Sequence, residues 1–312
     1  MLDMTSLCSA FRRPRILIIG CGDIGQRVVT QLLSGPNAHL GKTYTKPKIF
    51  ALSSSPERFA ELRQQGITPI GGDLDHPETL WRIARLASNV IHLAPPQNEG
   101  EHDLRTRNLI QILSQGAGSV RRFVYVSTTG VYGNRHGDYV DETSAPLATS
   151  ARSKRRLDAE SVLRHWAIHQ GVNLSILRVP GIYGPNRLPI ERLQANTPAL
   201  NSKEDAYSNH IHADDLARLV LGALFIGKPQ RIVNACDGSE QKMGDYFDEV
   251  ATALNLPKPK RLSREEVRSA VSPMLWSFMS ESRRVRNTRL PELKRPLLYP
   301  TVAHYLKTLK EQ

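Results

Sequence analysis

Three glycines near the start of the chain are spaced to hold a phosphate group. Gly20, Gly22 and Gly25 form the pattern G-x-G-x-x-G directly after the apolar run at residues 16–19. A run that is apolar at every position is typical of a parallel strand buried on both faces. In such a strand–turn–helix unit the glycines permit a tight turn, a close backbone approach to a pyrophosphate, and close helix packing. The segment therefore predicts a dinucleotide-binding loop, with the phosphates at the start of the following helix.

The elements that must hold this loop follow from the periodicity of the remaining sequence. Apolar runs predict strands at residues 16–19, 48–52, 67–70, 89–94, 122–127, 173–178 and 231–235. Apolar residues at helical spacing predict helices over residues 55–65, 78–86, 103–114, 158–170 and 214–225. Strands that alternate with helices indicate an α/β fold with a doubly wound parallel Rossmann sheet.

The chain divides into three predicted parts. Residues 1–14 are interpreted as a flexible N-terminal tail rather than a signal peptide. Residues 15–180 form the dinucleotide-binding Rossmann domain, and residues 181–312 form a smaller, mostly helical C-terminal substrate lobe. Within that lobe, residues 210–235 are expected to pack back on the Rossmann domain. The lobe would then close over the crevice at the carboxyl ends of the strands, where such sheets bind ligands.

Composition narrows the class of protein. With 40% hydrophobic and 23% charged residues among 312, the chain has the make-up of a globular protein. No apolar run approaches the 18 residues of a transmembrane helix, so no membrane association is expected. The three cysteines lie far apart, which fits free thiols in the reducing cytoplasm. Cys21 lies inside the glycine loop, where the helix dipole would lower its pKa, although a small loop filler is the favoured interpretation.

The net charge of +12 indicates an anionic partner. Residues 258–295 contain eleven Lys and Arg residues but only four Glu, and a second basic cluster spans residues 152–156. Neither is interleaved with aromatic residues, and no nucleic-acid motif accompanies them, so nucleic acid is an unlikely partner. A solvated basic face and a site for an anionic small-molecule substrate both remain open. The sequence also leaves a homodimer open.

Four motifs together carry a family resemblance. They are GCGDIG at residues 20–25, GDL at 72–74, YVSTTGVYG at 125–133 and LRVPGIYGP at 177–185. With this set the chain resembles the extended short-chain dehydrogenase/reductases, the NAD-dependent epimerase/dehydratase superfamily, which acts largely on nucleotide sugars. The resemblance spans nearly the whole chain from residue 15 onward.

This resemblance implies a nicotinamide dinucleotide and most of its binding residues. Asp73 would meet the adenine amino group, unless it only caps its loop, and Leu74 would line the ring pocket. The remaining implied cofactor residues are Gly20, Gly22, Asp23, Ile24, Gly25, Leu93 and Ala94.

The phosphate state of the cofactor is predicted at the end of the second strand. NAD-binding proteins place Asp or Glu there to hold the ribose hydroxyls. This chain has Ser53 and Ser54 instead, with Arg58 close behind. Hydroxyls, a helix N-terminus and an arginine suit a 2′-phosphate, so NADP is predicted over NAD.

The chain departs from the superfamily at its acid/base pair, Tyr-x-x-x-Lys. An alignment on Glu160 places Arg152 and Arg156 at these two positions, and the less favoured register places Ser150 and Lys154 there. The chain thus looks like the atypical, tyrosine-lacking branch related to nucleoside-diphosphate-sugar epimerases. Arg156 could hold the nicotinamide ribose in place of lysine, although an exposed basic helix face explains the arginines equally well.

Other candidate catalytic groups follow from the same motifs. Thr128 matches the Ser or Thr of the family that hydrogen-bonds the reacting oxygen, with Ser127 beside it, although both could simply cap a strand end. Tyr183 and Tyr132 are candidate substitute acids, although packing roles are more common for such tyrosines. We predict no metal site, because His165 and His169 lack a third ligand.

Two functional hypotheses remain. The first is an NAD(P)-binding, epimerase/dehydratase-like oxidoreductase acting on an anionic, nucleotide-sugar type of substrate. The alternative is a non-catalytic dinucleotide-binding sensor or scaffold protein, a hypothesis motivated by the missing tyrosine.

Overall fold

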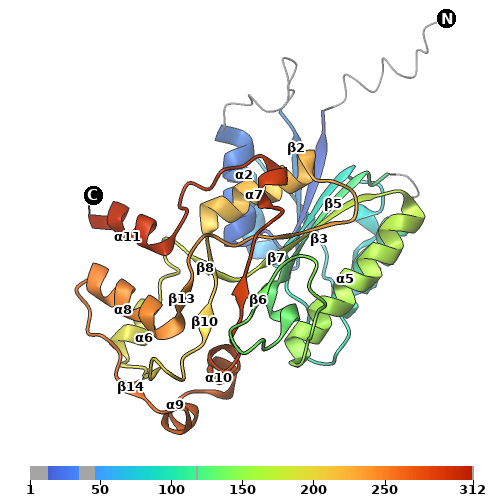
Figure 1. Ribbon diagram of the computed structural model, residues 1–312. Helices are drawn as coiled ribbons and strands as arrows, with labels where there is room; N and C mark the ends of the chain where they lie inside the picture. The colour runs from blue at the N-terminus through green and yellow to red at the C-terminus, as the bar shows by residue number, and fades with distance from the viewer. Residues whose placement is uncertain (1–12, 35–45, 117–118, 311–312) are drawn as a thin grey trace, which may run out of the picture.

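A parallel sheet of seven strands forms the centre of the molecule (Figure 1). The computed structural model describes residues 13–34, 46–116 and 119–310, so the predicted tail lies almost wholly outside the described residues. The strands lie in the order β12-β7-β5-β4-β1-β2-β3, and every neighbouring pair is parallel. Their bounds are β1 Arg15–Ile19, β2 Lys48–Ser53, β3 Thr68–Gly71, β4 Asn89–His92, β5 Arg122–Thr128, β7 Asn173–Val179 and β12 Arg231–Asn234. The doubly wound parallel Rossmann sheet predicted from the sequence is confirmed.

The order of the strands reverses between β1 and β4. From β1 the chain adds β2 and β3 on one side, and from β4 it adds β5, β7 and β12 on the other. Connections leave these two central strands in opposite directions, which opens a crevice at their carboxyl ends. The glycine loop follows β1 and therefore lies at this crevice.

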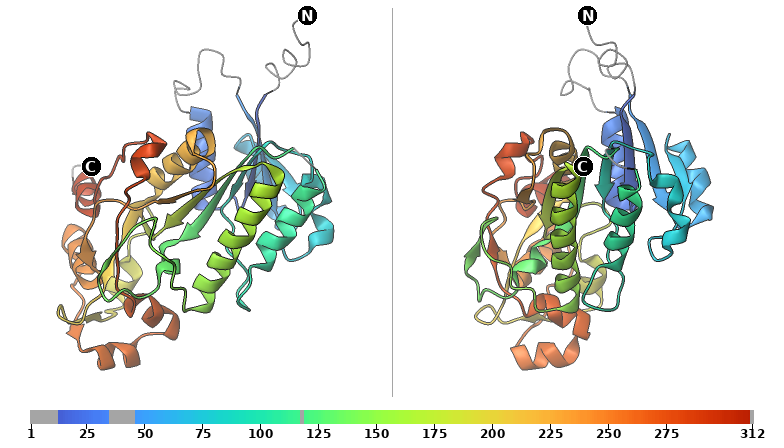
Figure 2. Two further views of the ribbon diagram at one scale, coloured as in Figure 1. Left: turned by 45° about the vertical axis from the view of Figure 1, so that its right-hand side comes forward. Right: turned by 90° about the vertical axis from the view of Figure 1, so that its right-hand side faces the viewer.

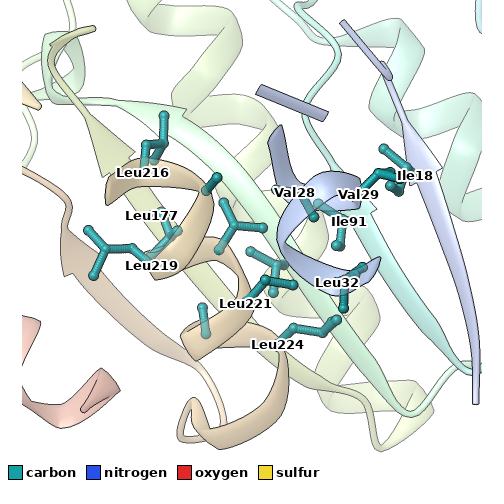
Figure 3. Close-up of a cluster of buried hydrophobic side chains, with 14 of the residues drawn as sticks. Ile18, Val28, Val29, Leu32, Ile91, Leu177, Leu216, Leu219, Leu221 and Leu224 are labelled. Atoms are coloured by element: carbon teal, nitrogen blue, oxygen red, sulfur yellow. The ribbon is translucent and has the colours of Figure 1, made fainter. Parts of the chain in front are cut away.

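Helices cover both faces of the sheet. On one face, α2 (Asp23–Ser34) and α7 (Ala213–Ile226) lie side by side over Ile16 and Ile18 of β1 (Figure 3). On the other face, α4 (Leu104–Ser114) and α5 (Ala151–Gln170) lie side by side over Leu17 and Ile19 (Figure 2). Successive side chains of a strand point to opposite faces, so an unbroken apolar strand feeds two cores at once.

The remaining chain builds a smaller part of short helices and two-stranded pairs at one side of the sheet (Figure 1). Its helices are α6 Ile190–Gln194, α8 Met243–Ala253, α9 Arg264–Ala270, α10 Pro273–Met279 and α11 Val302–Lys310. Its short strand pairs are β8 Gly181–Tyr183 with β11 His210–His212, β9 Ala199–Leu200 with β14 Arg261–Leu262, and β10 Tyr207–Ser208 with β13 Gln241–Lys242. A further pair, β6 Tyr139–Val140 with β15 Arg284–Val285, joins the two parts. Both β12 and α7, from residues 210–235, belong to the large sheet and its cover.

One predicted helix is wrong. Residues 78–86 do not form an α-helix but two 3₁₀ turns, Pro77–Thr79 and Trp81–Ile83. Leu80 and Ile83 are both buried, and their spacing of three residues suits a 3₁₀ turn as well as an α-helix. The predicted helix at 55–65 likewise begins with a 3₁₀ turn, Pro56–Arg58, before α3 (Phe59–Gln64).

Candidate active site

A cleft of about 510 Å³ opens at the carboxyl ends of β1, β2, β4, β5 and β7. The cofactor residues predicted from the sequence all line it: Gly20, Gly22, Asp23, Ile24, Gly25, Ser53, Ser54, Arg58, Asp73, Leu74, Leu93 and Ala94. Four of the five predicted catalytic residues also line it: Ser127, Thr128, Arg152 and Arg156. Tyr183 does not.

The glycine loop has the shape that a dinucleotide requires. Gly20 has a φ of +85°, and a Cβ there would lie 2.5 Å from the amide nitrogen of Ala94, so only glycine fits. A Cβ at Gly22 would meet nothing within 4 Å, so the backbone there faces open space. This open stretch leads into the N-terminus of α2, where free N–H groups favour phosphate oxygens. The loop therefore fits a pyrophosphate.

Asp23 puts a carboxylate at this phosphate-binding loop, and two arginines neutralise it. Its oxygens lie 2.9 Å from Nε of Arg27 and 2.6 Å from Nε of Arg187. Partial burial raises the pKa of Asp23, but the hydrogen bonds from Arg187 and Arg27 outweigh it and bring the pKa below its ordinary value. Arg187 also lines the cleft, although it is 164 residues away along the chain. Arg187 lies outside the four sequence motifs.

Polar groups gather at the end of β2, where the adenosine ribose would lie. The Ser53 hydroxyl accepts a hydrogen bond of 3.2 Å from the amide of Ser55, and no carboxylate occurs at this strand end. Arg58 donates from Nη2 to the carbonyl of Cys21, 3.0 Å away, which fixes its guanidinium against the glycine loop. The end of β2 thus presents the guanidinium of Arg58 and several serine hydroxyls to the cofactor.

Two residues of the loop regions have a structural role as well. Asp73 accepts a hydrogen bond of 3.0 Å from the amide of Asp75, so it caps its turn while it lines the cleft. The thiol of Cys21 is buried, and burial raises its pKa to about 11. The suggested lowering of the Cys21 pKa is therefore wrong, because the loss of water on burial outweighs the opposing effect of the Arg58 charge.

Ser127 and Thr128 end β5 but differ in what their hydroxyls do. Ser127 donates to Oε1 of Glu160 at 2.6 Å, inside a buried pair between Glu160 and Arg178. Within the described residues, the Thr128 hydroxyl accepts from the amide of Gly130 at 3.1 Å and donates no hydrogen bond. Thr128 therefore keeps its own proton to donate into the cleft, whereas the proton of Ser127 is already engaged.

The two arginines of α5 reach the cleft from one face of the helix. Arg156 is 8% exposed, and its Nη1 lies 3.0 Å from the carbonyl of Val126 and 3.1 Å from the hydroxyl of Tyr125. Arg152, one turn earlier, lies at the mouth. Lys154, which the less favoured register places at the lysine position of the pair, forms an ion pair with Glu101 at the surface.

The candidate substitute acids are placed away from the cleft. Tyr183 is fully buried in the core of the smaller C-terminal part, where its ring centroid lies 5.3 Å from that of His212, and burial raises its pKa above the ordinary value. Tyr132 is also fully buried, and its hydroxyl donates to Asn234 at 2.8 Å. Among the residues described, no tyrosine lines the cleft. The prediction of Tyr183 as a catalytic residue is therefore corrected to a packing role.

Comparison with known proteins gives the family. Residues 20–225 match the family described as NAD(P)H-binding. Protein YeeZ of Escherichia coli is 26% identical over 179 residues, which cover 56% of this chain and 62% of YeeZ. GDP-6-deoxy-D-mannose reductase of Pseudomonas aeruginosa is 25% identical over 234 residues, which cover 63% of this chain and 75% of the reductase. The chain spans less than two thirds of the length of the first curated relatives it matches.

The fold also matches solved structures over almost its whole length. A double mutant of dTDP-glucose 4,6-dehydratase from Streptomyces venezuelae, solved with NAD bound, superposes with a TM-score of 0.74 at 19% identity. The match covers 96% of this chain and 97% of the dehydratase. None of the helices in the described part of the chain combines the length and apolar character needed to cross a bilayer. By its sequence match over residues 20–225, this chain belongs to the NAD(P)H-binding family and takes a nicotinamide dinucleotide as its cofactor, and its Rossmann fold matches that of the dehydratase structure.

Proposed function

We propose that this protein is an NADP-preferring oxidoreductase of the epimerase/dehydratase type that acts on an anionic, nucleotide- or phosphate-bearing substrate. One observation carries the proposal: a single cleft is lined by the glycine loop, by Ser53 and Arg58 at one end, and by Thr128 and Arg156 at the other. The cofactor would supply a hydride acceptor or donor, and the chain would supply binding and orientation. The activities for which the reductase and dehydratase relatives are named support a nucleotide-sugar type of substrate.

Thr128 is the group best placed to hold the reacting oxygen. Its hydroxyl accepts from Gly130 and has its own proton left to donate, as a hydrogen bond to a carbonyl oxygen of the substrate requires. Arg156 cannot replace the lysine of the usual pair as a group that tunes a neighbouring acid, because a guanidinium stays protonated. Proton transfer then falls to Thr128, to water, or to the substrate itself.

The absence of a tyrosine from the described lining favours one alternative, a dinucleotide-binding sensor or scaffold without chemistry. The experiment that separates the two follows the nicotinamide absorbance while nucleotide sugars and phosphorylated sugars are added with NADP or NAD. Turnover that Thr128→Ala reduces at least about a hundredfold, with cofactor affinity unchanged, supports the enzyme. Tight cofactor binding with no absorbance change across the whole panel supports the sensor.

A further inference from the structure

Five arginines of the described ranges line the cleft, and they differ in how their charge is balanced. Three have a carboxylate partner: Arg58 lies 3.7 Å from Glu61, Arg105 lies 2.5 Å from Asp75, and Arg187 lies 2.6 Å from Asp23. These three lie where the glycine loop and the ends of β2 and β3 line the cleft. The other two, Arg152 and Arg156, stand on α5 next to the end of β5, and neither makes an ion pair with any carboxylate in the described ranges.

Arg156 is buried and yet incompletely bonded. All its hydrogen bonds leave from Nη1 and end on neutral oxygens: the carbonyls of Ala94 and Val126 and the hydroxyl of Tyr125. Its Nε is buried without a partner, and its Nη2 makes no hydrogen bond with the described residues. A guanidinium keeps its charge when buried, so this site carries a positive charge that the protein does not balance.

The carboxylates near Arg156 are already committed to other groups. Asp103 faces Arg156 from the start of α4, but its two oxygens accept the amide and the hydroxyl of Thr106. Glu160 follows one turn later on α5, but Arg178 and Ser127 occupy its oxygens. Neither carboxylate makes a hydrogen bond or an ion pair with Arg156.

Arg152 adds a second cation one helical turn away. Its guanidinium stacks on the ring of Phe278 in α10, 5.2 Å from the ring centroid, and makes no hydrogen bond within the described residues. Stacking leaves the edge of a guanidinium, where its N–H groups lie, able to bind an oxyanion. Arg152 is exposed at the mouth of the cleft and Arg156 lies buried in its wall.

We propose that Arg152 and Arg156 together bind an oxyanion of the substrate, a carboxylate or a phosphate, beside Thr128. This inference rests on the proposed function and sharpens it, because it places the negative charge of the substrate close to the reacting carbon. Nη1 of Arg156 donates to the carbonyl of Val126, two residues before Thr128. Arg152, Arg156 and Thr128 therefore share one end of the cleft. A neutral ribose at Arg156 would bring no negative charge to the pair, whereas an oxyanion brings negative charge that both arginines can contact.

The test measures small anions against protein saturated with NADP, so that the cofactor's own phosphates already occupy the glycine loop and the region of Arg58. Malonate and inorganic phosphate are titrated by calorimetry at constant chloride. We expect Arg152→Gln to weaken the better-bound anion by about tenfold or more, since it removes charge-assisted hydrogen bonds. Arg152→Lys is expected to restore part of the affinity. Tighter binding of malonate indicates a carboxylate, and tighter binding of phosphate indicates a phosphate ester.

The matched control is Lys154→Gln, which removes one positive charge from the same helix at a residue that pairs with Glu101 at the surface. Its anion affinity should stay within about twofold of wild type if the effect is local rather than a change in net charge. Equal anion affinity in wild type and Arg152→Gln, or no anion binding to the NADP-loaded protein, overturns the proposal.

Cofactor affinity is measured on the same samples and should be unchanged in all three variants. Failure of wild type to bind NADP or NAD overturns the proposed function instead. In that case the same anion titrations, run without cofactor, still test whether the two arginines bind an oxyanion.

Discussion

Ser53 lies at the end of β2, where the adenosine end of the cleft begins. A carboxylate at this place would hold two ribose hydroxyls and repel a 2′-phosphate, whereas the serine hydroxyl is neutral. Arg58, fixed on the carbonyl of Cys21, adds a positive charge to the same wall. One residue type at one strand end is thus expected to decide between NADP and NAD.

Ser53→Asp is expected to weaken NADP and to spare or improve NAD. Two like charges at this distance in a partly solvated pocket cost about 1 to 3 kcal/mol, or roughly five- to a hundredfold in affinity. Fluorescence titration of both cofactors measures the ratio. A wild-type protein that prefers NAD, or a variant with an unchanged NADP/NAD ratio, would contradict this account of the strand end.

Arg58→Ala should shift the same ratio toward NAD by a smaller factor, because the guanidinium also contacts the loop backbone and Glu61. The matched control is Arg63→Ala, on an exposed arginine of α3 that does not line the cleft. Equal shifts in the two variants would show that general electrostatics, not a local contact, sets the preference.

The buried carboxyl of Asp237, outside the cleft, makes the stability of the protein depend on pH. Burial raises its pKa from 3.8 to about 6, although the amide of Ser239 and the hydroxyl of Tyr183 act in the opposite direction. The folded protein therefore holds this proton more tightly than the unfolded chain. Its contribution to stability is present below about pH 4 and is lost as the pH rises toward 6.

The Asp237→Asn variant has no carboxyl group that could ionise here, so its stability relative to wild type should rise with pH. The difference in the free energy of unfolding should grow by up to about 3 kcal/mol between pH 4 and pH 7. Urea unfolding of both proteins across that range measures the difference. Parallel pH profiles for the two proteins would show that Asp237 does not titrate there.

At the scale of elements, a buried ion pair fastens α5 to the sheet. Glu160 of α5 lies 2.6 Å from Arg178 of β7, both side chains are almost fully buried, and Ser127 of β5 donates to the same carboxylate. The helix that carries Arg152 and Arg156 is thereby fixed against the strand that ends in Thr128. The geometry of the cleft depends on this contact.

Glu160→Gln should lower the free energy of unfolding by about 3 to 5 kcal/mol, because it leaves Arg178 charged and buried without a counter-ion. Chemical denaturation measures the loss. Glu101→Gln, which breaks only the surface pair with Lys154, should leave the midpoint unchanged. A double variant Glu160→Gln/Arg178→Met should recover part of the stability, and equal losses in the single and double variants would argue against an unpaired charge as the cause.

At the scale of the whole molecule, α7 closes the core that supports the glycine loop. Helix α7 begins more than 175 residues after α2 ends, yet the two helices pack together over β1 (Figure 3). Leu224→Ala, at a fully buried position, should cost about 2 to 5 kcal/mol through lost burial and the remaining cavity. Ile226→Ala, two residues later and 38% exposed, should cost far less, as thermal or urea unfolding can show. Similar costs would mean that α7 is not a required part of this core.

Features of the protein that rest on local patterns can be predicted from its sequence alone. An unbroken apolar strand followed by G-x-G-x-x-G predicts both the buried β1 and the phosphate loop. Each glycine is required by the local geometry of the turn and the start of the helix, within a few residues of the chain. The alternation of strands and helices predicted the doubly wound sheet, and the strand order then brought every predicted cofactor residue to one cleft.

Features that depend on contacts between residues far apart in the sequence follow from the folded chain. Local spacing cannot tell a 3₁₀ turn from an α-helix when two buried residues are three apart, so residues 78–86 were assigned to the wrong element. Tyr183 has the right chemistry for an acid, but its burial beside His212 follows from the packing of β8 against β11. Likewise, whether an arginine is free to bind a ligand depends on carboxylates far along the chain, and so only the folded structure separates Arg187, paired with Asp23, from Arg152 and Arg156.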